Sequence, residues 1–278
     1  MTEYAVDSHA HVYNPARFAF NDKSATYVPH PKEIGTPQQF LAVLDAHRMS
    51  HGLLINPMGG YGSDNRCLLD AIASSKGRFK GVAVVDPDIS DTGLRELQDG
   101  GVVGARFGLI FGKGQALLTV EGKRLLARLK EIGWFAQIHY EHEQILPVVD
   151  VLKASGIGLV FDHCGRPDFT REIQQAGFQA LLDFGRRGNA AVKLSGAFRW
   201  SLQPWPHADG EPYVRALIEA YGLDNCVWGS DWPFVRVDGR IDYGPLRALV
   251  DRWLPDAADR HKVLWETPQR WFGFQPLQ

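Results

Sequence analysis

Eight short apolar runs that alternate with amphipathic segments predict a (β/α)8 barrel, in which each of eight parallel strands is followed by a helix. Most of these runs are continuously apolar, as is typical of parallel strands buried on both faces. The chain has 278 residues, of which 45% are hydrophobic and 22% charged, enough for one large core. Barrels of about 250 residues fold as one unit. We therefore expect a single barrel domain over residues 1–278.

The predicted strands are Tyr4–His11, Gly52–Pro57, Phe79–Asp86, Val102–Phe107, Trp134–Tyr140, Gly158–His163, Ala190–Ser195 and Cys226–Trp232. A doubly wound open sheet is the structural alternative, because it also alternates strands and helices. No Gly-x-Gly-x-x-Gly motif follows the first strand, which argues against the dinucleotide-binding form of that fold.

The segments between the strands carry apolar residues at helical spacing. Thr36 is placed to cap a helix before Pro37. The predicted helices are Thr36–Met49, Asp64–Lys76, Glu121–Ile132, Glu143–Ala154, Gln174–Arg187, Glu211–Tyr221, Gly244–Leu254 and Ala257–Phe272. The long stretch Asn14–Gly35, with several prolines and aromatic residues, predicts an ordered loop over one barrel mouth. Gly59–Gly62 predicts a flexible lid or turn, because no Gly-Lys-Ser/Thr follows to make a phosphate loop.

Charge and cysteine content exclude several classes of partner. Thirty basic and 32 acidic residues give a formal charge of −2, without the basic excess that binding to nucleic acid or to a membrane surface requires. Three cysteines at these spacings form neither a disulfide framework nor a zinc knuckle. The sequence shows no signal peptide and no apolar stretch of bilayer length. We expect a cytoplasmic protein with a small-molecule substrate, and a homo-oligomer is compatible with this pattern.

Polar and ionisable side chains gather at the carboxyl ends of the predicted strands, where barrel enzymes build their sites. His9 and His11 end the first strand, and residues i and i+2 of a strand point the same way. A structural pair of core histidines is the alternative, but two at a strand end favour function. Asp231 ends the eighth strand among tryptophans, either capping a turn or taking part in catalysis. We expect it to be the only strand-end carboxylate near the histidine pair, which favours catalysis.

The remaining strand-end residues carry weaker signals. His163 resembles the histidine pair in its position, and Asp162 beside it should point the opposite way as a structural residue. His139 is a weaker candidate, and Lys193 either points inward or extends to solvent. Arg106, Arg166 and Arg199 lie at three different strand ends. A surface ion pair would explain any one of them, but three around one mouth predict recognition of carboxylates.

Five motifs in this order resemble the amidohydrolase superfamily, in the branch of 2-pyrone-4,6-dicarboxylate lactonase and related sugar-lactone hydrolases. The resemblance covers essentially the whole chain. The motifs are Asp7-Ser-His-Ala-His11, Gly104-Ala-Arg106-Phe, Asp162-His-Cys-Gly-Arg-Pro167, Lys193-Leu-Ser-Gly196 and Gly229-Ser-Asp-Trp-Pro233.

The resemblance implies a role for each matching residue. Asp231 would activate the attacking water, while His9, His11 and His163 would bind the lactone carbonyl oxygen and the developing oxyanion. Arg106, Arg166 and Arg199 fall where substrate-carboxylate arginines are expected, and Tyr27 resembles a substrate-facing loop tyrosine.

One departure from the resemblance bears on the cofactor. His139 stands where the dicarboxylate lactonase carries a tyrosine, and metal-binding relatives use a histidine there as a ligand. His9, His11, His139 and Asp231 would form a three-nitrogen, one-oxygen shell for Zn²⁺ or another divalent metal. The motif set as a whole is nearer to the metal-independent branch, so we expect no required cofactor and place His139 among the substrate-binding residues.

We therefore expect a hydrolase that opens a small carboxylated lactone, resembling 2-pyrone-4,6-dicarboxylate. Two enzymatic alternatives remain from the same superfamily: a zinc-dependent decarboxylase or hydratase, and a neutral sugar-lactone hydrolase. A non-catalytic binding protein is disfavoured because no member of the implied catalytic set is missing.

Overall fold

The computed structural model describes residues 4–21, 25–111 and 115–277, and within them eight parallel strands form one sheet in sequential order. The strands are β1 (Val6–Ala10), β2 (His51–Ile55), β3 (Phe79–Ala83), β4 (Val102–Gly108), β5 (Phe135–His139), β6 (Leu159–Phe161), β7 (Ala190–Lys193) and β8 (Cys226–Val227). Backbone bonds from Ser8 to Trp228 and from His11 to Trp232 close the sheet between its first and last strands. The predicted barrel is confirmed, and the open-sheet alternative is wrong.

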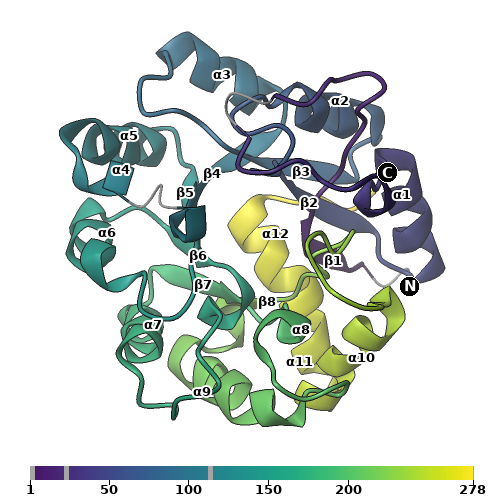
Figure 1. Ribbon diagram of the computed structural model, residues 1–278, viewed down its shortest axis with the longest axis vertical. Helices are drawn as coiled ribbons and strands as arrows, with labels where there is room; N and C mark the ends of the chain where they lie inside the picture. The colour runs from purple at the N-terminus through teal and green to yellow at the C-terminus, as the bar shows by residue number, and fades with distance from the viewer. Residues whose placement is uncertain (1–3, 22–24, 112–114, 278) are drawn as a thin grey trace.

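Helices surround this sheet on the outside, except that the last of them in the chain lies across one end of the barrel (Figure 1). They are α1 (Pro37–Ala46), α2 (Arg66–Ser74), α3 (Asp91–Asp99), α4 (Gln115–Leu118), α5 (Val120–Glu131), α6 (Val149–Ser155), α7 (Ala176–Arg187), α8 (Ala197–Trp200), α9 (Glu211–Tyr221), α10 (Tyr243–Trp253), α11 (Ala257–His261) and α12 (Thr267–Phe272). Thr36 caps α1 as expected, because its hydroxyl accepts the Gln39 N–H while the Gln39 side chain accepts the Thr36 N–H.

The structure corrects the predicted elements in several places. The predicted helix Glu143–Ala154 becomes α-helical only at Val149, and the predicted helix Ala257–Phe272 is interrupted by a π-helical turn over Lys262–Glu266. Helix α3 was not predicted, since it buries only Leu94 and Leu97, although Ser90 caps its start. The short helices α4 and α8 were also missed. The sixth and eighth strands end earlier than predicted, at Phe161 and Val227, so the residues directly after them lie outside the strands, although Trp232 still pairs with Ala10.

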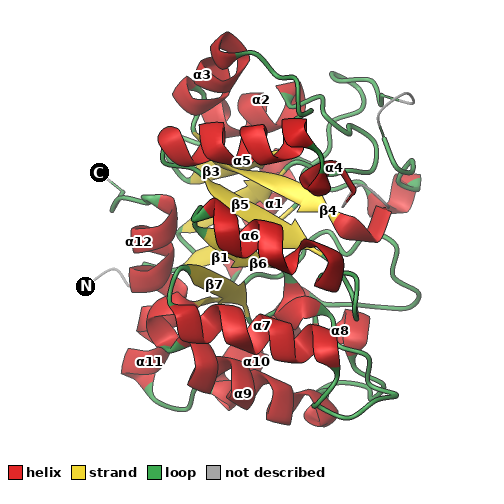
Figure 2. Ribbon diagram, turned by 90° about the vertical axis from the view of Figure 1, so that its left-hand side faces the viewer, coloured by secondary structure: helices red, strands yellow, loops and turns green. Residues whose placement is uncertain are grey.

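The C-terminal helix α12 closes one end of the barrel, and the long loops lie at the other end (Figure 2). Phe272 and Phe274 pack with the apolar side chains that the strands send inward, among them Val6, Leu53 and Val160. That core fills the amino-terminal half of the barrel and leaves the carboxyl ends of the strands for polar groups.

The Asn14–Gly35 loop, described except for residues 22–24, lies over the open mouth, and Tyr27 reaches a cavity there. Gly59 and Gly60 support this segment. A Cβ at Gly59 would come within 2.2 Å of the Tyr27 ring, and the Gly60 N–H donates to the Tyr27 carbonyl. The Gly59–Gly62 segment is therefore a buried turn beneath Tyr27 rather than an exposed lid. Within the described residues no helix is both long and apolar enough to cross a membrane.

Candidate active site

A cavity of about 190 Å³ opens at the carboxyl ends of the strands. Every residue predicted for the site lines it except His9, which lies beneath the floor and is fully buried. The lining residues that the sequence predicted are His11, Tyr27, Arg106, His139, His163, Arg166, Arg199 and Asp231. The fold therefore brings side chains from seven parts of the chain to one polar cavity.

A bulge in β1 aims the two histidines into the barrel. The register with β2 shifts between Asp7 and Ala10, so strict alternation fails there. Asp7 faces outward and accepts the Tyr243 hydroxyl of α10 at 3.0 Å. His9 and His11 point inward, with their Nε2 atoms 3.3 Å apart. The two rings converge as their spacing predicts.

Asp231 lies in a turn after β8 that carries its carboxylate over these histidines. Its oxygens lie 3.5 Å from His11 Nε2, 3.5 Å from His163 Nε2 and 3.7 Å from His9 Nε2. The residue has a left-handed φ of 63°, a costly conformation for a side chain other than glycine. A Cβ at Gly229 would come within 2.6 Å of His9, so only glycine lets this turn lie so close to β1.

Arg199 keeps the Asp231 carboxylate ionised. Burial by itself would raise the pKa of Asp231, but the Arg199 guanidinium outweighs burial and holds that pKa well below its usual range. Arg199 Nε donates a hydrogen bond to Asp231 Oδ2. The site thus holds a buried anion at neutral pH.

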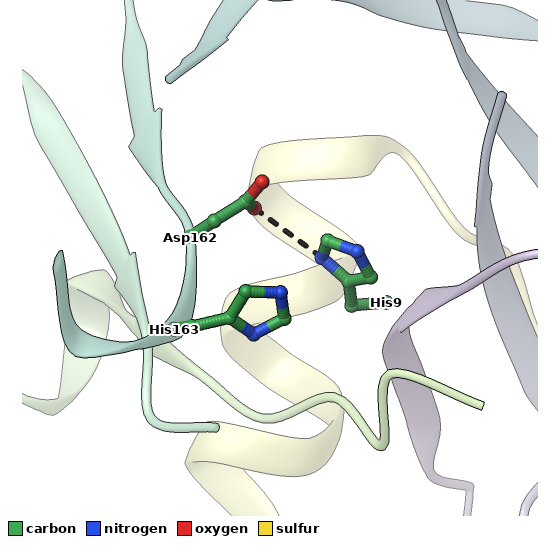
Figure 3. Close-up of side chains that lie close together, drawn as sticks. All are labelled: His9, Asp162 and His163. Carbon is green, nitrogen blue, oxygen red and sulfur yellow. Dashed lines mark ion pairs between the residues drawn. The ribbon is translucent and has the colours of Figure 1, made fainter. Parts of the chain in front are cut away.

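His163 and Asp162 both face His9 (Figure 3), which corrects the expectation that they point in opposite directions. Because β6 ends at Phe161, strand alternation no longer applies, and His163 has a φ of 50°. Burial lowers the pKa of His163 to about 3, so its ring is neutral. Its Nδ1 lies 3.0 Å from Ser195 Oγ.

Asp162 is a second carboxylate at the histidine pair, so the expectation that Asp231 would be the only one is wrong. It is fully buried and lies against three cationic or polar groups: Arg106 Nη2 at 3.2 Å, Gln137 Nε2 at 3.1 Å and Lys193 Nζ at 3.2 Å. Burial alone would raise the pKa of Asp162, but Lys193 and then its other cationic neighbours hold it well below the usual range. The ionised Asp162 is thus a charged centre under the site floor.

The three predicted arginines do not stand as unopposed cations. Arg106 pairs with Asp162, Arg166 Nη2 lies 3.1 Å from Glu141, and Arg199 pairs with Asp231. A fourth, Arg236, was missed by the sequence analysis and lies over the Tyr27 ring at 5.0 Å. Four guanidinium groups and two carboxylates therefore line the cavity wall, a balance that favours an anionic ligand.

Other groups at the site were also missed. Gln137 lies two residues before His139 on β5, and this i, i+2 spacing after the predicted strand start could have placed it inside the barrel. Glu141 follows β5 and had no sequence signal beyond its position. Lys193, left open between two orientations, points inward and is fully buried.

The arrangement does not fit the four-ligand metal shell that the sequence suggested. Two groups of ligand atoms among the described residues lie within 4.8 Å of one another, His9–His11–Asp231 and His9–Asp162–His163, and neither includes His139. A metal-binding histidine presents the lone pair of one ring nitrogen and donates the other N–H to an acceptor. The second ring nitrogen of His9, Nδ1, instead faces the Lys193 ammonium at 3.0 Å. The donor atoms are thus close enough for a metal, but His9 Nδ1 faces an ammonium group rather than an acceptor.

The chain is similar to known proteins in both sequence and structure. The chain is 31% identical to a 4-sulfomuconolactone hydrolase of Rhizobium radiobacter, over 97% of this chain and 90% of that protein. It is 30% identical to a 2-pyrone-4,6-dicarboxylate hydrolase of Comamonas testosteroni, over 96% and 89% of the two chains. A solved structure from Pseudomonas putida, described as a 2-pyrone-4,6-dicarboxylic acid hydrolase, superposes with a TM-score of 0.87 at 32% identity, covering 98% of each chain.

The family model described as amidohydrolase matches residues 6–274, from the first strand to the segment after α12. That range contains every motif on which the resemblance was based, and the relatives cover nearly the whole chain. The resemblance is confirmed: the chain belongs to the amidohydrolase family.

Proposed function

We propose that this protein hydrolyses a small lactone that carries one or more carboxylates, using water activated by Asp231. The observation that carries the proposal is the ionised, buried Asp231 at the floor of an arginine-lined cavity, against three histidines. The relatives named as hydrolases of a dicarboxylated pyrone and of a sulfonated lactone support the same class of anionic cyclic ester.

In this proposal Asp231 accepts a proton from the water molecule that attacks the lactone carbonyl carbon. Because Asp231 is bound by Arg199, it is a weak base until that contact loosens. A substrate carboxylate that draws the Arg199 guanidinium toward itself would strengthen the base at the moment of binding. Arg199 thus keeps Asp231 ionised before the substrate binds and then binds the substrate carboxylate. Its loss should raise KM, and it should lower kcat because burial would then favour protonated Asp231, which cannot act as a base.

Charge that develops on the carbonyl oxygen needs hydrogen-bond donors already aimed at it. His163 suits this role, since the Ser195 hydroxyl can donate to its Nδ1 and leave the ring proton on Nε2, which lies at the cavity 3.5 Å from Asp231 Oδ2. Arg106 adds a cation to the same wall. His9 and His11 complete the proposed catalytic group, and Tyr27, His139 and Arg166 the proposed substrate-binding group.

The reaction class is tested by its products. Opening a lactone ring releases one acid equivalent and no carbon dioxide, whereas a decarboxylase releases carbon dioxide. We expect proton release in a weakly buffered assay with 2-pyrone-4,6-dicarboxylate, without carbon dioxide. Carbon dioxide in proportion to substrate consumed would replace the hydrolase with the decarboxylase alternative.

Removal of divalent metals should leave this activity intact. The proposal assigns base and oxyanion roles to protein side chains alone, so protein dialysed against a chelator should keep its kcat/KM and contain far less than one metal ion per chain by elemental analysis. Loss of activity on dialysis, with recovery on adding Zn²⁺, would contradict the metal-independent mechanism.

Arg166→Met should weaken binding of acidic lactones. Arg166 lines the cavity and its loss leaves Asp162 and Asp231 with their own partners. A charge-assisted hydrogen bond contributes about 1.5–3 kcal/mol, so we expect KM to rise roughly 10- to 100-fold with a smaller change in kcat. Arg171→Met, an exposed arginine paired with Glu143, is the control. An unchanged KM in Arg166→Met would assign Arg166 a structural role.

The buried, unpaired cysteines agree with the proposed cytoplasmic location, since nothing in the described structure links them as disulfides.

A further inference from the structure

We propose that Lys193 is a positioning residue that fixes the protonation pattern of His9, making it a hydrogen-bond donor at Nε2, and so prevents the His9–His11–Asp231 group from binding a divalent metal. The inference deepens the proposed metal-independent hydrolysis and rests on it. It concerns a lysine at the end of β7 to which no role has been assigned.

Lys193 contacts two hydrogen-bond acceptors and the Asp162 carboxylate. Its Nζ lies 2.8 Å from Gln137 Oε1, 3.0 Å from His9 Nδ1 and 3.2 Å from Asp162 Oδ1. An ammonium has three donors and no acceptor. The side chain is fully buried, so water does not compete for these contacts. His9 Nδ1 therefore accepts a hydrogen bond from Lys193 and carries no proton of its own.

The other end of the histidine pair is compatible with the same pattern. His11 Nδ1 lies 2.8 Å from the Ile55 carbonyl oxygen, which can only accept, so His11 carries a proton on Nδ1. His11 Nε2 lies 3.3 Å from His9 Nε2 and 3.5 Å from Asp231 Oδ1. Because Lys193 leaves His9 Nδ1 bare, the one ring proton of a neutral His9 lies on Nε2. The hydrogen bonds can then run in one direction, from Lys193 through His9 and His11 to Ile55.

Asp162 does not offer His9 an alternative partner for Nδ1. Its Oδ1 lies 3.3 Å from His9 Nδ1 (Figure 3) and 3.2 Å from Lys193 Nζ, and among the described residues both are ion-pair contacts without hydrogen-bond geometry. Asp162 Oδ2 receives Arg106 and Gln137. The carboxylate thus attracts Lys193 and keeps it charged, while the lysine makes the hydrogen bond to the ring.

Metal binding at His9 needs the opposite pattern. The ring would have to present a bare Nε2 and carry its proton on Nδ1, directly against the Lys193 ammonium. The metal would also add a second cation behind the same ring. Lys193 therefore occupies the place that an acceptor holds behind a metal-binding histidine. Removing it should allow His9 to change its tautomer.

The first test measures the tautomers directly in the wild-type protein. Histidine labelled with ¹⁵N reports the protonation of each ring nitrogen in long-range proton–nitrogen spectra, and His9→Gln and His11→Gln assign the two rings. We expect opposite patterns, with His9 protonated on Nε2 and His11 protonated on Nδ1. A proton on His9 Nδ1 in the wild type would overturn the inference whatever the variants do.

The second test measures binding of Co²⁺ to wild-type protein and to Lys193→Met, by titration of the visible absorption of bound cobalt. Residues that contact the second ring nitrogen of a metal-binding histidine change metal affinity about 10- to 100-fold, and we expect a gain of that size in Lys193→Met. Lys193→Arg, which keeps a cationic donor, should bind Co²⁺ as weakly as the wild type. Lys153→Met, at an exposed pair with Asp183, controls for loss of a lysine elsewhere. Equal cobalt affinity in wild type and in folded Lys193→Met would contradict the proposal.

Neither test uses a substrate, so its outcome is separate from that of the proposed function. If the tautomers are as expected but no carboxylated lactone is hydrolysed, the role of Lys193 stands and the substrate assignment fails. If Lys193→Met does not fold, the wild-type spectra decide the question alone.

Discussion

Asp231→Asn should lower kcat for lactone hydrolysis at least about 100-fold while leaving the fold intact, because removing a general base costs two to four orders of magnitude. Asparagine nearly preserves the shape of the side chain and cannot accept the water proton. Arg199 would lose its anionic partner, but it lies at the cavity wall, where water or substrate can solvate it. Initial rates together with a circular dichroism spectrum and a melting curve measure both parts of the prediction.

Asp88→Asn is the matched control. It makes the same chemical change at a residue that lies in an exposed loop after β3 and outside the cavity. Its kcat should equal that of the wild type. Turnover near the wild-type level in a folded Asp231→Asn protein would show that another group activates the water.

Asp162→Asn should have the largest effect on stability. The substitution removes the negative charge of Asp162. Among the described residues, Asp162 is the only carboxylate that pairs with Lys193 and with Arg106. Breaking a buried ion pair by removing one partner costs about 3–5 kcal/mol, because the remaining charges stay buried without compensation. We expect the free energy of unfolding, measured by urea denaturation, to fall by about that amount.

The slope of the urea transition should stay unchanged, because the substitution alters stability rather than the surface exposed on unfolding. Asp88→Asn again serves as the control, with an expected change close to zero. A loss below about 1 kcal/mol in Asp162→Asn would mean that water or a rearranged partner compensates the buried cations.

The fold was predictable because it depends on repetition along the chain. Continuous apolar strands and amphipathic helices are visible without knowledge of long-range contacts, and the Thr36 cap was visible as a local pattern. Helix α3 was missed because the repeating apolar pattern is weak there: its nine residues bury only Leu94 and Leu97. The Ser90 cap was the signal that could have located it.

The site was predictable as a set of residues and not as a set of partners. Strand-end position alone selected His9, His11 and Asp231, which the fold brings together. The direction of Asp162 could not be predicted, because it depends on where β6 ends and on the left-handed turn at His163. The pairing of Arg199 with Asp231 joins two segments 32 residues apart and has no local signature.

The central claim is that the cavity binds an acidic lactone and opens it without a metal. The most direct measurement is the ratio of kcat/KM for a dicarboxylated 2-pyrone to kcat/KM for an uncharged lactone of the same ring size, both with a chelator present. Two carboxylates that each gain about 1.5–3 kcal/mol from guanidinium groups predict a ratio of about 100 or more. A higher kcat/KM on the uncharged lactone would contradict the account and make neutral sugar-lactone hydrolysis the better interpretation.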